Sequence, residues 1–328
     1  MHSERIAYLG PAGTFTETAL AGILAARMSG DRVGDVDRDH GDVDRDGGVD
    51  RVPMATVGRC FEAVRRGEVD AAVVPIENSV EGGVNATLDA LSASDPPLVI
   101  VAEHLVPVTF VLGATAGTRL EDVRRVASHP HAEAQCRAWL SDHLPGVVVE
   151  PAMSTAAAAA GLAHDSPAYD AAICAPAAAE RYRLIVLAED IGDRPATTRF
   201  VAVRLPGAVP QPTGRDRTSV VAYLRENHAG ALLELLEQFA ARGVDLTRIE
   251  SRPTGAGFGE YCFSIDLDGH VREPRVAEAL KGLHRLSPLT RFLGSYPRAD
   301  GASSRVPGWA GAGGFTAAEQ WLEGLLEE

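Results

Sequence analysis

One stretch restricts the fold of this chain more than any other: a short apolar run, Ala71–Val74, that leads straight into the polar segment VPIENSVEGG. The run has the length and composition of a buried strand, and Pro75 marks where its pairing would end. A carboxylate, an amide and a hydroxyl then follow on consecutive residues, Glu77, Asn78 and Ser79. Because ligands of α/β domains bind beyond the carboxyl ends of the strands, the segment is as consistent with a binding site as with an ordinary polar turn.

Size and charge narrow the class of protein. With 328 residues, the chain is long enough for two or three domains. A net charge of −14 argues against a nucleic-acid-binding protein, and no apolar run approaches the ~20 residues of a membrane span. The N-terminus enters a predicted strand at once, so we expect no secretory signal and a cytoplasmic protein. The cysteines are far apart, which favours free thiols in a reducing compartment: Cys60, Cys136, Cys174 and Cys262.

The segment before residue 29 predicts a strand followed by a capped helix. A strand is expected over Arg5–Leu9, and a helix with Leu20, Ile23 and Leu24 on one face follows the glycine-containing segment GPAGTFTETAL. Thr14, with Glu17 three residues later, fits a capping box. The exposed N–H groups of such a helix start suit an anionic ligand, but the Gly-Lys-Ser/Thr ending of a nucleotide loop is missing.

Residues 29–52 differ in composition from the rest of the chain. They repeat DVDRD and contain few large apolar side chains, so we predict a disordered insert. Asp42, Asp44 and Asp46 match the start of a calcium-binding EF-hand loop. Pro53 stands at the twelfth position, where such a loop needs a bidentate Glu, and calcium binding is therefore not expected.

Two further segments carry polar side chains to predicted strand or helix ends. Strands at 98–104 and 106–113, joined near Pro107, suggest a crossing into a second lobe, where Gln135 lies in a predicted helix behind His129 and His131. The two histidines suggest a metal, but no third ligand has suitable spacing, so no metal site is predicted. In DIGDRPATTRFVAV, a loop is expected to bring Thr198, Arg199 and Phe200 to the mouth of a strand. There they would bind a carboxylated ring or simply belong to an edge strand.

The last third predicts a separate domain. After a linker rich in Pro and Gly, strands and helices alternate as βαββαβ over 218–295, which is the ferredoxin-like arrangement. A glycine-rich tail with a short amphipathic helix follows from Arg298.

Five segments, taken in order, make the chain similar to the monofunctional prephenate dehydratase family over nearly its whole length. They are GPAGTFTETA, VPIENSVEGG, HPHAEAQC, TTRFVAV and GALLELLEQFAARGVDLTRIESRP. The resemblance implies a two-lobed catalytic region of type-2 periplasmic-binding-protein shape at 1–205, with crossings near 105 and 190. An α+β ACT regulatory domain at 216–297 and a tail at 298–328 would follow. It also implies that prephenate loses CO₂ and water to give phenylpyruvate, without a cofactor.

The resemblance assigns roles to individual residues. Asn78, Ser79, Gln135 and Thr198 would be catalytic, with Thr198 donating to the departing hydroxyl, while Arg199, Phe200 and the helix start at Thr14 would bind substrate. An ACT domain further implies a homo-oligomer, most simply a tetramer, inhibited by L-phenylalanine. The effector site would comprise Gly230, Ala231, Leu232, Leu233, Asp245, Leu246, Glu250, Ser251, Arg252 and Pro253, where Asp245 replaces an Asn frequent in the family.

Two alternatives remain open. An arogenate dehydratase would differ only in accepting an amino group in place of the keto group. A non-catalytic small-molecule sensing module would share the fold without the reaction, since fold alone does not fix function.

Overall fold

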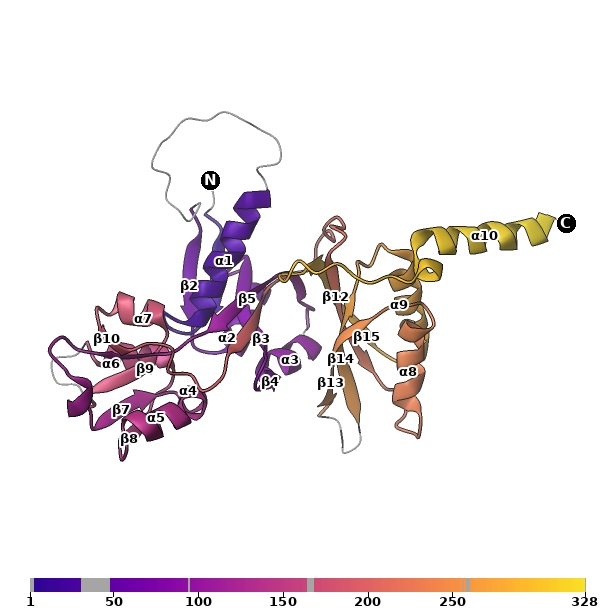
Figure 1. Cartoon of the computed structure of the whole chain (residues 1–328). Helices are drawn as coiled ribbons and strands as arrows, with labels where there is room; N and C mark the ends of the chain where they lie inside the picture. Colours follow the sequence, from indigo (N-terminus) through magenta and orange to yellow (C-terminus); the bar gives the residue numbers. More distant parts are fainter. Residues whose placement is uncertain are drawn as a thin grey trace. The chain divides into compact units, whose positions relative to one another are not determined.

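The computed structural model describes residues 3–30, 48–93, 95–163, 168–255, 257 and 260–327 (Figure 1). The chain divides into two compact units, one made of Met1–Val84 with His104–Phe200 and the other of Asn85–Glu103 with Val201–Glu328. Strands β5 (Val99–Val108) and β11 (Ala196–Arg204) each continue from one unit into the other. In the described part of the chain, no helix is long and apolar enough to cross a membrane.

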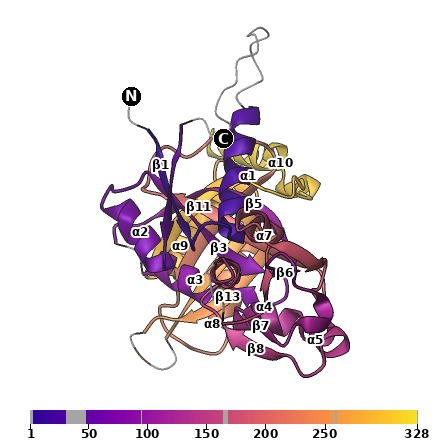
Figure 2. The same cartoon turned by 90° about the vertical axis from the view of Figure 1, so that its left-hand side faces the viewer.

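The first sheet has the strand order β2-β1-β3-β11-β5, with β4 paired to β3. Its remaining strands are β1 (Arg5–Leu9), β2 (Asp50–Met54), β3 (Ala71–Asn78) and β4 (Gly82–Gly83). Strands β1, β2 and β3 run parallel, with β1 in the middle. Right-handed connections from β1 outward to β2 and back across to β3 place the two intervening helices on opposite faces of the sheet. These helices are α1 (Phe15–Gly30) and α2 (Val57–Arg65), seen on either side of the strands in Figure 2.

The predicted disordered insert at 29–52 is too long at both ends. Ser29 and Gly30 close helix α1, and residues 50–52 belong to β2, where Asp50 pairs with Arg5. Strand β2 pairs along its length with β1, so the tertiary register orders residues whose composition alone predicts a loop. Positions 31–47, which include Asp42, Asp44 and Asp46, lie outside the described residues.

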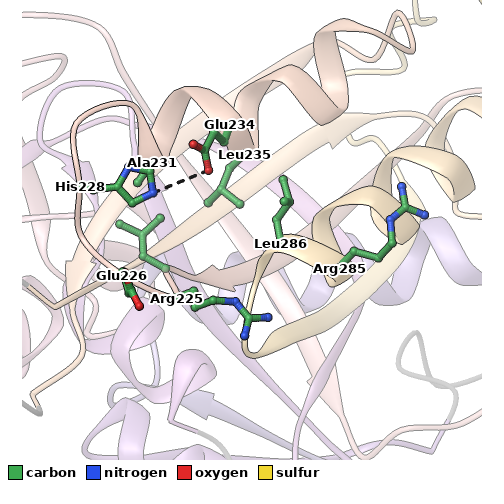
Figure 3. Close-up of a pocket in the computed structure, with 9 residues that line it drawn as sticks. Arg225, Glu226, His228, Ala231, Glu234, Leu235, Arg285 and Leu286 are labelled. Atoms are coloured by element: carbon green, nitrogen blue, oxygen red, sulfur yellow. Dashed lines mark ion pairs between the residues drawn. The ribbon is translucent and has the colours of Figure 1, made fainter.

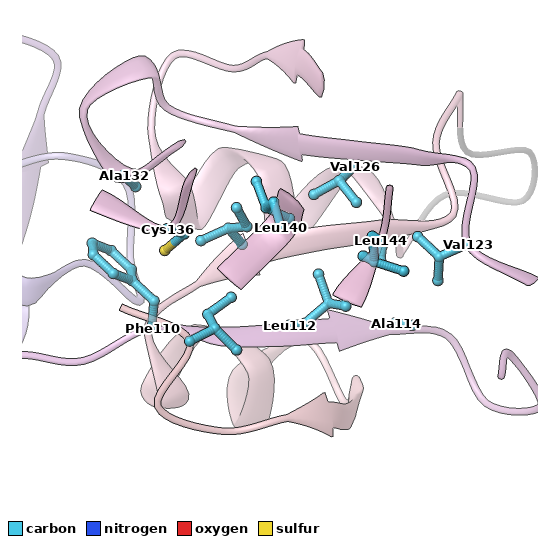
Figure 4. Packing of buried hydrophobic residues seen from close by; sticks show 12 residues of the cluster. Phe110, Leu112, Ala114, Val123, Val126, Ala132, Cys136, Leu140 and Leu144 are labelled. Atoms are coloured by element: carbon cyan, nitrogen blue, oxygen red, sulfur yellow. The ribbon is translucent and has the colours of Figure 1, made fainter. Parts of the chain in front are cut away.

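The second sheet belongs wholly to the first unit and has the order β10-β6-β9-β7-β8. Its strands are β6 (Val111–Ala114), β7 (Arg125–Ser128), β8 (Val148–Pro151), β9 (Ala171–Cys174) and β10 (Ile185–Ala188). Four short helices accompany them: α4 (Pro130–Gln135), α5 (Arg137–His143), α6 (Thr155–Gly161) and α7 (Pro176–Arg181). Phe110, Leu112, Val126 and Leu140 form part of its buried core (Figure 4).

Three sequence-based element boundaries differ from the structure. Pro107 lies inside the continuous strand β5, so the predicted break there is wrong. The predicted helix around Gln135 is broken at Cys136, whose φ of −118° and ψ of 12° separate α4 from α5. Thr198, Arg199 and Phe200 lie within strand β11, which begins at Ala196, rather than in a loop before it.

The second unit contains the predicted βαββαβ domain. Its sheet has the order β13-β14-β12-β15 and is antiparallel. The elements are β12 (Asp216–Tyr223), α8 (Ala231–Ala240), β13 (Leu246–Pro253), β14 (Tyr261–Asp268), α9 (Pro274–Leu286) and β15 (Thr290–Pro297). Val220, Leu235, Phe239, Ile265 and Leu283 pack between sheet and helices. The tail continues into helix α10 (Ala312–Glu327).

Residues 85–103 also belong to this second unit. Helix α3 (Asn85–Ser92) is bound to the antiparallel sheet by Tyr223, whose hydroxyl donates to the carbonyl of Ser92 at 2.9 Å. The buried Glu103 accepts from Arg217 at 2.7 Å. Gly294, at φ +132°, allows β15 to come so close that a Cβ there would lie 2.2 Å from the carbonyl oxygen of Ile100. The unit is therefore held by both polar and backbone contacts.

All four cysteines are buried and reduced. Burial raises the pKa of the thiols of Cys60, Cys136 and Cys174 to about 12, and it also raises the pKa of Cys262. These thiols pack as small apolar side chains, as the sequence predicts.

Candidate active site

A cleft of about 790 Å³ opens in the first unit. The parallel strands β1, β2 and β3 end at it, contributing Leu9, Met54 and Asn78. In the second sheet, His129 and Met153 follow the ends of β7 and β8 and line the same cleft. The cleft thus lies where an α/β architecture places ligands. Its volume is within the range of roughly 300–1,000 Å³ that is typical of pockets for small molecules.

Asn78 is the centre of a hydrogen-bond network in this cleft. Its Oδ1 accepts from the backbone N–H groups of Val80 and Glu81, at 2.8 and 3.1 Å. Its Nδ2 therefore faces the other way and donates to Oγ1 of Thr198 at 2.9 Å. Since Oγ1 of Thr198 accepts this bond, the hydroxyl's own proton is available for another acceptor. The network leaves a buried threonine as an oriented donor at the cleft.

Ser79 joins two strands instead of lining the cleft. Its Oγ accepts from the backbone N–H of Thr197 at 2.9 Å, and its own N–H donates to the carbonyl of Thr197, also at 2.9 Å. These bonds fix the end of β3 to the start of β11. Ser79 therefore helps to hold Asn78 opposite Thr198.

The residues of β11 alternate in direction, as strand residues do. Thr198 and Phe200 line the cleft, whereas Arg199 between them does not belong to the lining. Nε of the buried Arg199 pairs with Oε2 of Glu77 at 3.0 Å. β11 lies between β3 and β5, so the edge-strand alternative is wrong, and the contact of Arg199 is an ion pair with Glu77 of the neighbouring strand β3.

Gln135 contacts a residue that the sequence does not single out. Its Nε2 donates to Oε1 of Glu81 at 2.8 Å, and Oε2 of Glu81 pairs with Nδ1 of His131. All three side chains line the cleft. The sequence places Glu81 in a turn, and its partners lie 50 and 54 positions away, so no local pattern reveals the contact.

His129 caps helix α4. Its Nδ1 accepts from the backbone N–H of His131 at 3.3 Å, which requires that nitrogen to be unprotonated. Burial lowers the pKa of His129, the nearby His131 lowers it further, and Glu81 opposes the shift. Among the described residues, no three His, Cys, Asp or Glu side chains gather as a metal-binding group.

The start of helix α1 differs in detail from the predicted capping box. Oε2 of Glu17 accepts from the N–H of Gly13 at 2.6 Å, one residue before the expected partner. The Thr14 hydroxyl points back to the carbonyl of Leu9, at 3.4 Å. Thr14 and Phe15 nevertheless line the cleft, so the helix begins at the site as predicted.

Aromatic side chains supply an apolar wall. Phe15 and Phe110 meet edge to face with ring centroids 5.9 Å apart, and Phe200 lies beside them in the lining. Among the described residues that form the lining, none is Lys or Arg. The cleft therefore offers rings, amides and hydroxyls to a ligand, with Glu81 as its carboxylate.

A smaller hollow of about 230 Å³ lies in the βαββαβ domain (Figure 3). Arg225, Glu226 and Arg285 line it, and Nε2 of His228 lies 3.8 Å from Oε2 of Glu234. Of the ten predicted effector-site residues, Ala231 lines this hollow. Gly230, at φ +95°, caps α8, while residues 250–253 lie on β13, at the edge of the sheet.

Arg252, one of those ten residues, is engaged elsewhere. Its Nε and Nη2 donate to the two carboxylate oxygens of Asp89, both at 2.8 Å, and Nη1 donates to Asn85 at 2.9 Å. Both partners lie on α3. Of the predicted effector residues, the hollow in the described part of this domain therefore has only Ala231 in its lining.

Fold and site together define a two-lobed α/β region with a cleft, followed by a small βαββαβ domain. The family model for prephenate dehydratase matches residues 6–207, and the ACT domain model matches residues 218–285. The chain belongs to the prephenate dehydratase family, whose members are carbon–oxygen lyases.

Relatives cover nearly the whole chain. A prephenate dehydratase of Amycolatopsis methanolica is 48% identical over 321 residues, which is 97% of each chain. A solved prephenate dehydratase of Arthrobacter aurescens, in complex with L-Phe, has 51% identity and a TM-score of 0.87, covering 99% of this chain and all of its own. The structure of GqqA, described as a novel type of quorum quenching acylase, has 29% identity and a TM-score of 0.73, covering 90% of this chain and 98% of its own. The architecture is therefore compatible with more than one chemistry.

Proposed function

We propose that the chain converts prephenate to phenylpyruvate, with Thr198 as the donor to the departing hydroxyl. The bond between the ring and its carboxylate breaks, CO₂ leaves, and the electron pair moves through the ring. The C–O bond at the opposite ring carbon breaks, and the oxygen leaves as water after receiving a proton. Because aromatisation drives these steps, the protein needs to orient the ring and to stabilise the leaving oxygen.

The observation that carries this proposal is the oriented pair of Asn78 and Thr198. Asn78 donates to Oγ1 of Thr198, so the hydroxyl of Thr198 keeps its own proton to donate to a ligand in the cleft. A threonine hydroxyl is a weak acid, so it acts by hydrogen bonding or by relaying a proton rather than through a shifted pKa. Phe15, Phe110 and Phe200 hold the ring.

The test is a direct assay of purified protein with prephenate and, separately, with arogenate. Phenylpyruvate formed from prephenate supports the proposal. Phenylalanine formed from arogenate, with no product from prephenate, would instead make the chain an arogenate dehydratase. Tight binding of either compound without product would indicate a sensing module.

We also propose that residues 216–297 act as a regulatory domain that binds L-phenylalanine between paired copies of the chain, in a homotetramer whose catalytic region is 1–205. Support comes from the Arthrobacter relative, whose structure holds L-Phe, and from the hollow in the described part of this domain, which Ala231 lines. Light scattering with and without L-phenylalanine, combined with turnover measurements, tests the assembly and the inhibition together.

A further inference from the structure

Glu81 places a carboxylate inside the cleft, and both of its oxygens are engaged. Oε1 accepts from Nε2 of Gln135 at 2.8 Å, and Oε2 pairs with Nδ1 of His131. Both partners lie on helix α4, four positions apart. The backbone N–H of Glu81 is in turn held by Asn78 at 3.1 Å. The contact is therefore a built arrangement, in which two side-chain donors converge on one carboxylate.

The charge of the cleft makes this arrangement informative. A substrate with two carboxylates brings two negative charges into a lining that, among the described residues, has no Lys or Arg. Arg199, which the family resemblance suggests for binding substrate, pairs with Glu77 outside the lining. The Glu81 carboxylate would repel the carboxylates of the substrate at short range, and it already accepts from donors that suit a carboxylate.

We propose that Gln135 and His131 form a subsite for the side-chain carboxylate of the substrate, which the product phenylpyruvate retains, and that Glu81 occupies this subsite in the unliganded protein. This inference rests on the proposed function, which supplies a dicarboxylate as substrate. The substrate carboxylate accepts the same hydrogen bonds that Glu81 accepts and displaces it. The apparent affinity is then reduced by the fraction of molecules in which Glu81 occupies the subsite.

Replacing Glu81 tests the competition directly. Glu81→Ala removes the internal carboxylate, so the Kd of phenylpyruvate, measured by calorimetry, and the KM for prephenate should both fall, by about tenfold if Glu81 occupies the subsite in nine molecules of ten. Glu81→Gln keeps an acceptor but no charge, so a smaller fall is expected, and it provides a second variant if the alanine protein does not fold. Glu133→Gln is the matched control: it removes a charge from the same helix at a residue outside the described lining, and both constants should stay unchanged.

A double-mutant cycle locates the effect. Gln135→Ala should raise the Kd of phenylpyruvate. When Glu81→Ala is added to Gln135→Ala, the Kd should fall much less than in the parent background, because the donor for which Glu81 and the ligand compete has been removed. Weaker or unchanged binding in Glu81→Ala, or an equal gain with and without Gln135, would overturn the inference. A parent protein that forms no phenylpyruvate from prephenate would instead overturn the proposed function, a result distinct from any change in these binding constants.

Discussion

Arg252 holds Asp89 with two parallel hydrogen bonds of 2.8 Å, one to each carboxylate oxygen. Asp89 lies on helix α3, which begins at Asn85. The helix therefore starts only a few residues after Asn78 and Glu81 in the chain. The sequence assigns Arg252 to the effector site, but the structure joins its guanidinium to the helix that continues from the catalytic loop. We therefore predict that Arg252 takes part in the proposed regulation through its contact with Asp89, rather than by binding the effector.

Arg252→Ala should therefore separate effector binding from inhibition. We expect L-phenylalanine to bind with nearly the parent affinity, as measured by calorimetry, while its inhibition of turnover becomes weaker. Asp89→Asn removes the negative charge that Arg252 binds. It should likewise leave the affinity for L-phenylalanine nearly unchanged and weaken the inhibition of turnover. If both variants lose L-phenylalanine binding altogether, Arg252 belongs to the binding site itself.

Thr198→Ala should lower kcat by roughly 10²–10⁴-fold with a much smaller change in KM, because the lost contact is worth most in the transition state. Thr197→Ala is the matched control, since this neighbour points to the other face of β11 and is not among the described lining residues. Steady-state kinetics of the folded variants decides the matter. A Thr198→Ala protein with near-parent kcat would exclude Thr198 as the donor.

Asn78→Asp should reduce kcat although the loop stays in place. A carboxylate at this position still accepts from the N–H groups of Val80 and Glu81, but it no longer donates to Thr198. The Thr198 hydroxyl would turn to donate to the carboxylate, away from the leaving group. We expect a loss of kcat close to that of Thr198→Ala, with an unchanged melting temperature; full activity would show that the orientation of this hydroxyl does not matter.

Acid should destabilise the first unit in part through His104. Its ring lies against α1 so closely that a Cβ on Gly22 would come within 2.2 Å of Nε2, and burial lowers the pKa of His104. Between that lowered pKa and about 6.5, the unfolded chain binds the proton more readily than the folded one, so the free energy of unfolding falls as the pH drops below about 6.5. His104→Phe should show a smaller drop in melting temperature between neutral and mildly acidic buffer. An identical drop in parent and variant would assign the acid sensitivity to other groups.

Two deletions test the corrected limits of the insert. Replacing residues 29–52 by a short Gly/Ser link should lower the melting temperature by several degrees, because it removes the pairing of β2 with β1 and the end of α1. Replacing 31–47 alone leaves those contacts intact, and a change in surface loop length costs little free energy. Differential scanning calorimetry of both proteins compares them. Equal stability of the two deletions would mean that residues 50–52 contribute nothing to the sheet.

The fold followed closely from the sequence where the hydrophobic period was clear. Helix α9, the second helix of the predicted βαββαβ domain, begins at Pro274 and ends at Leu286, and both its proline at the first turn and its apolar face are local signals. The start of strand β2 was missed because Asp50 and Arg51 are polar, and their order comes from pairing with β1. The break between α4 and α5 at Cys136 likewise leaves no local signal, since the residues around it favour helix.

The candidate site was predictable in part. Asn78, Gln135 and Thr198 were found from the motifs they share with a known family, and the structure brings all three to one cleft. The direction of Arg199 could have been inferred from strand alternation, had the start of β11 been recognised at Ala196 instead of further along. Glu81 could not, because its role depends on Gln135 and His131, which only the tertiary structure brings near.

The buried cysteines offer an experimental opportunity. With four thiols enclosed and three of their pKa values near 12, the native protein should resist maleimide reagents at neutral pH. A cysteine introduced at an exposed position on the rim of the cleft, such as Met153, would then be the site at which a fluorophore attaches. A dye there would report each arrival and departure of a ligand in real time, without any need to strip the protein of its native sulfur chemistry first.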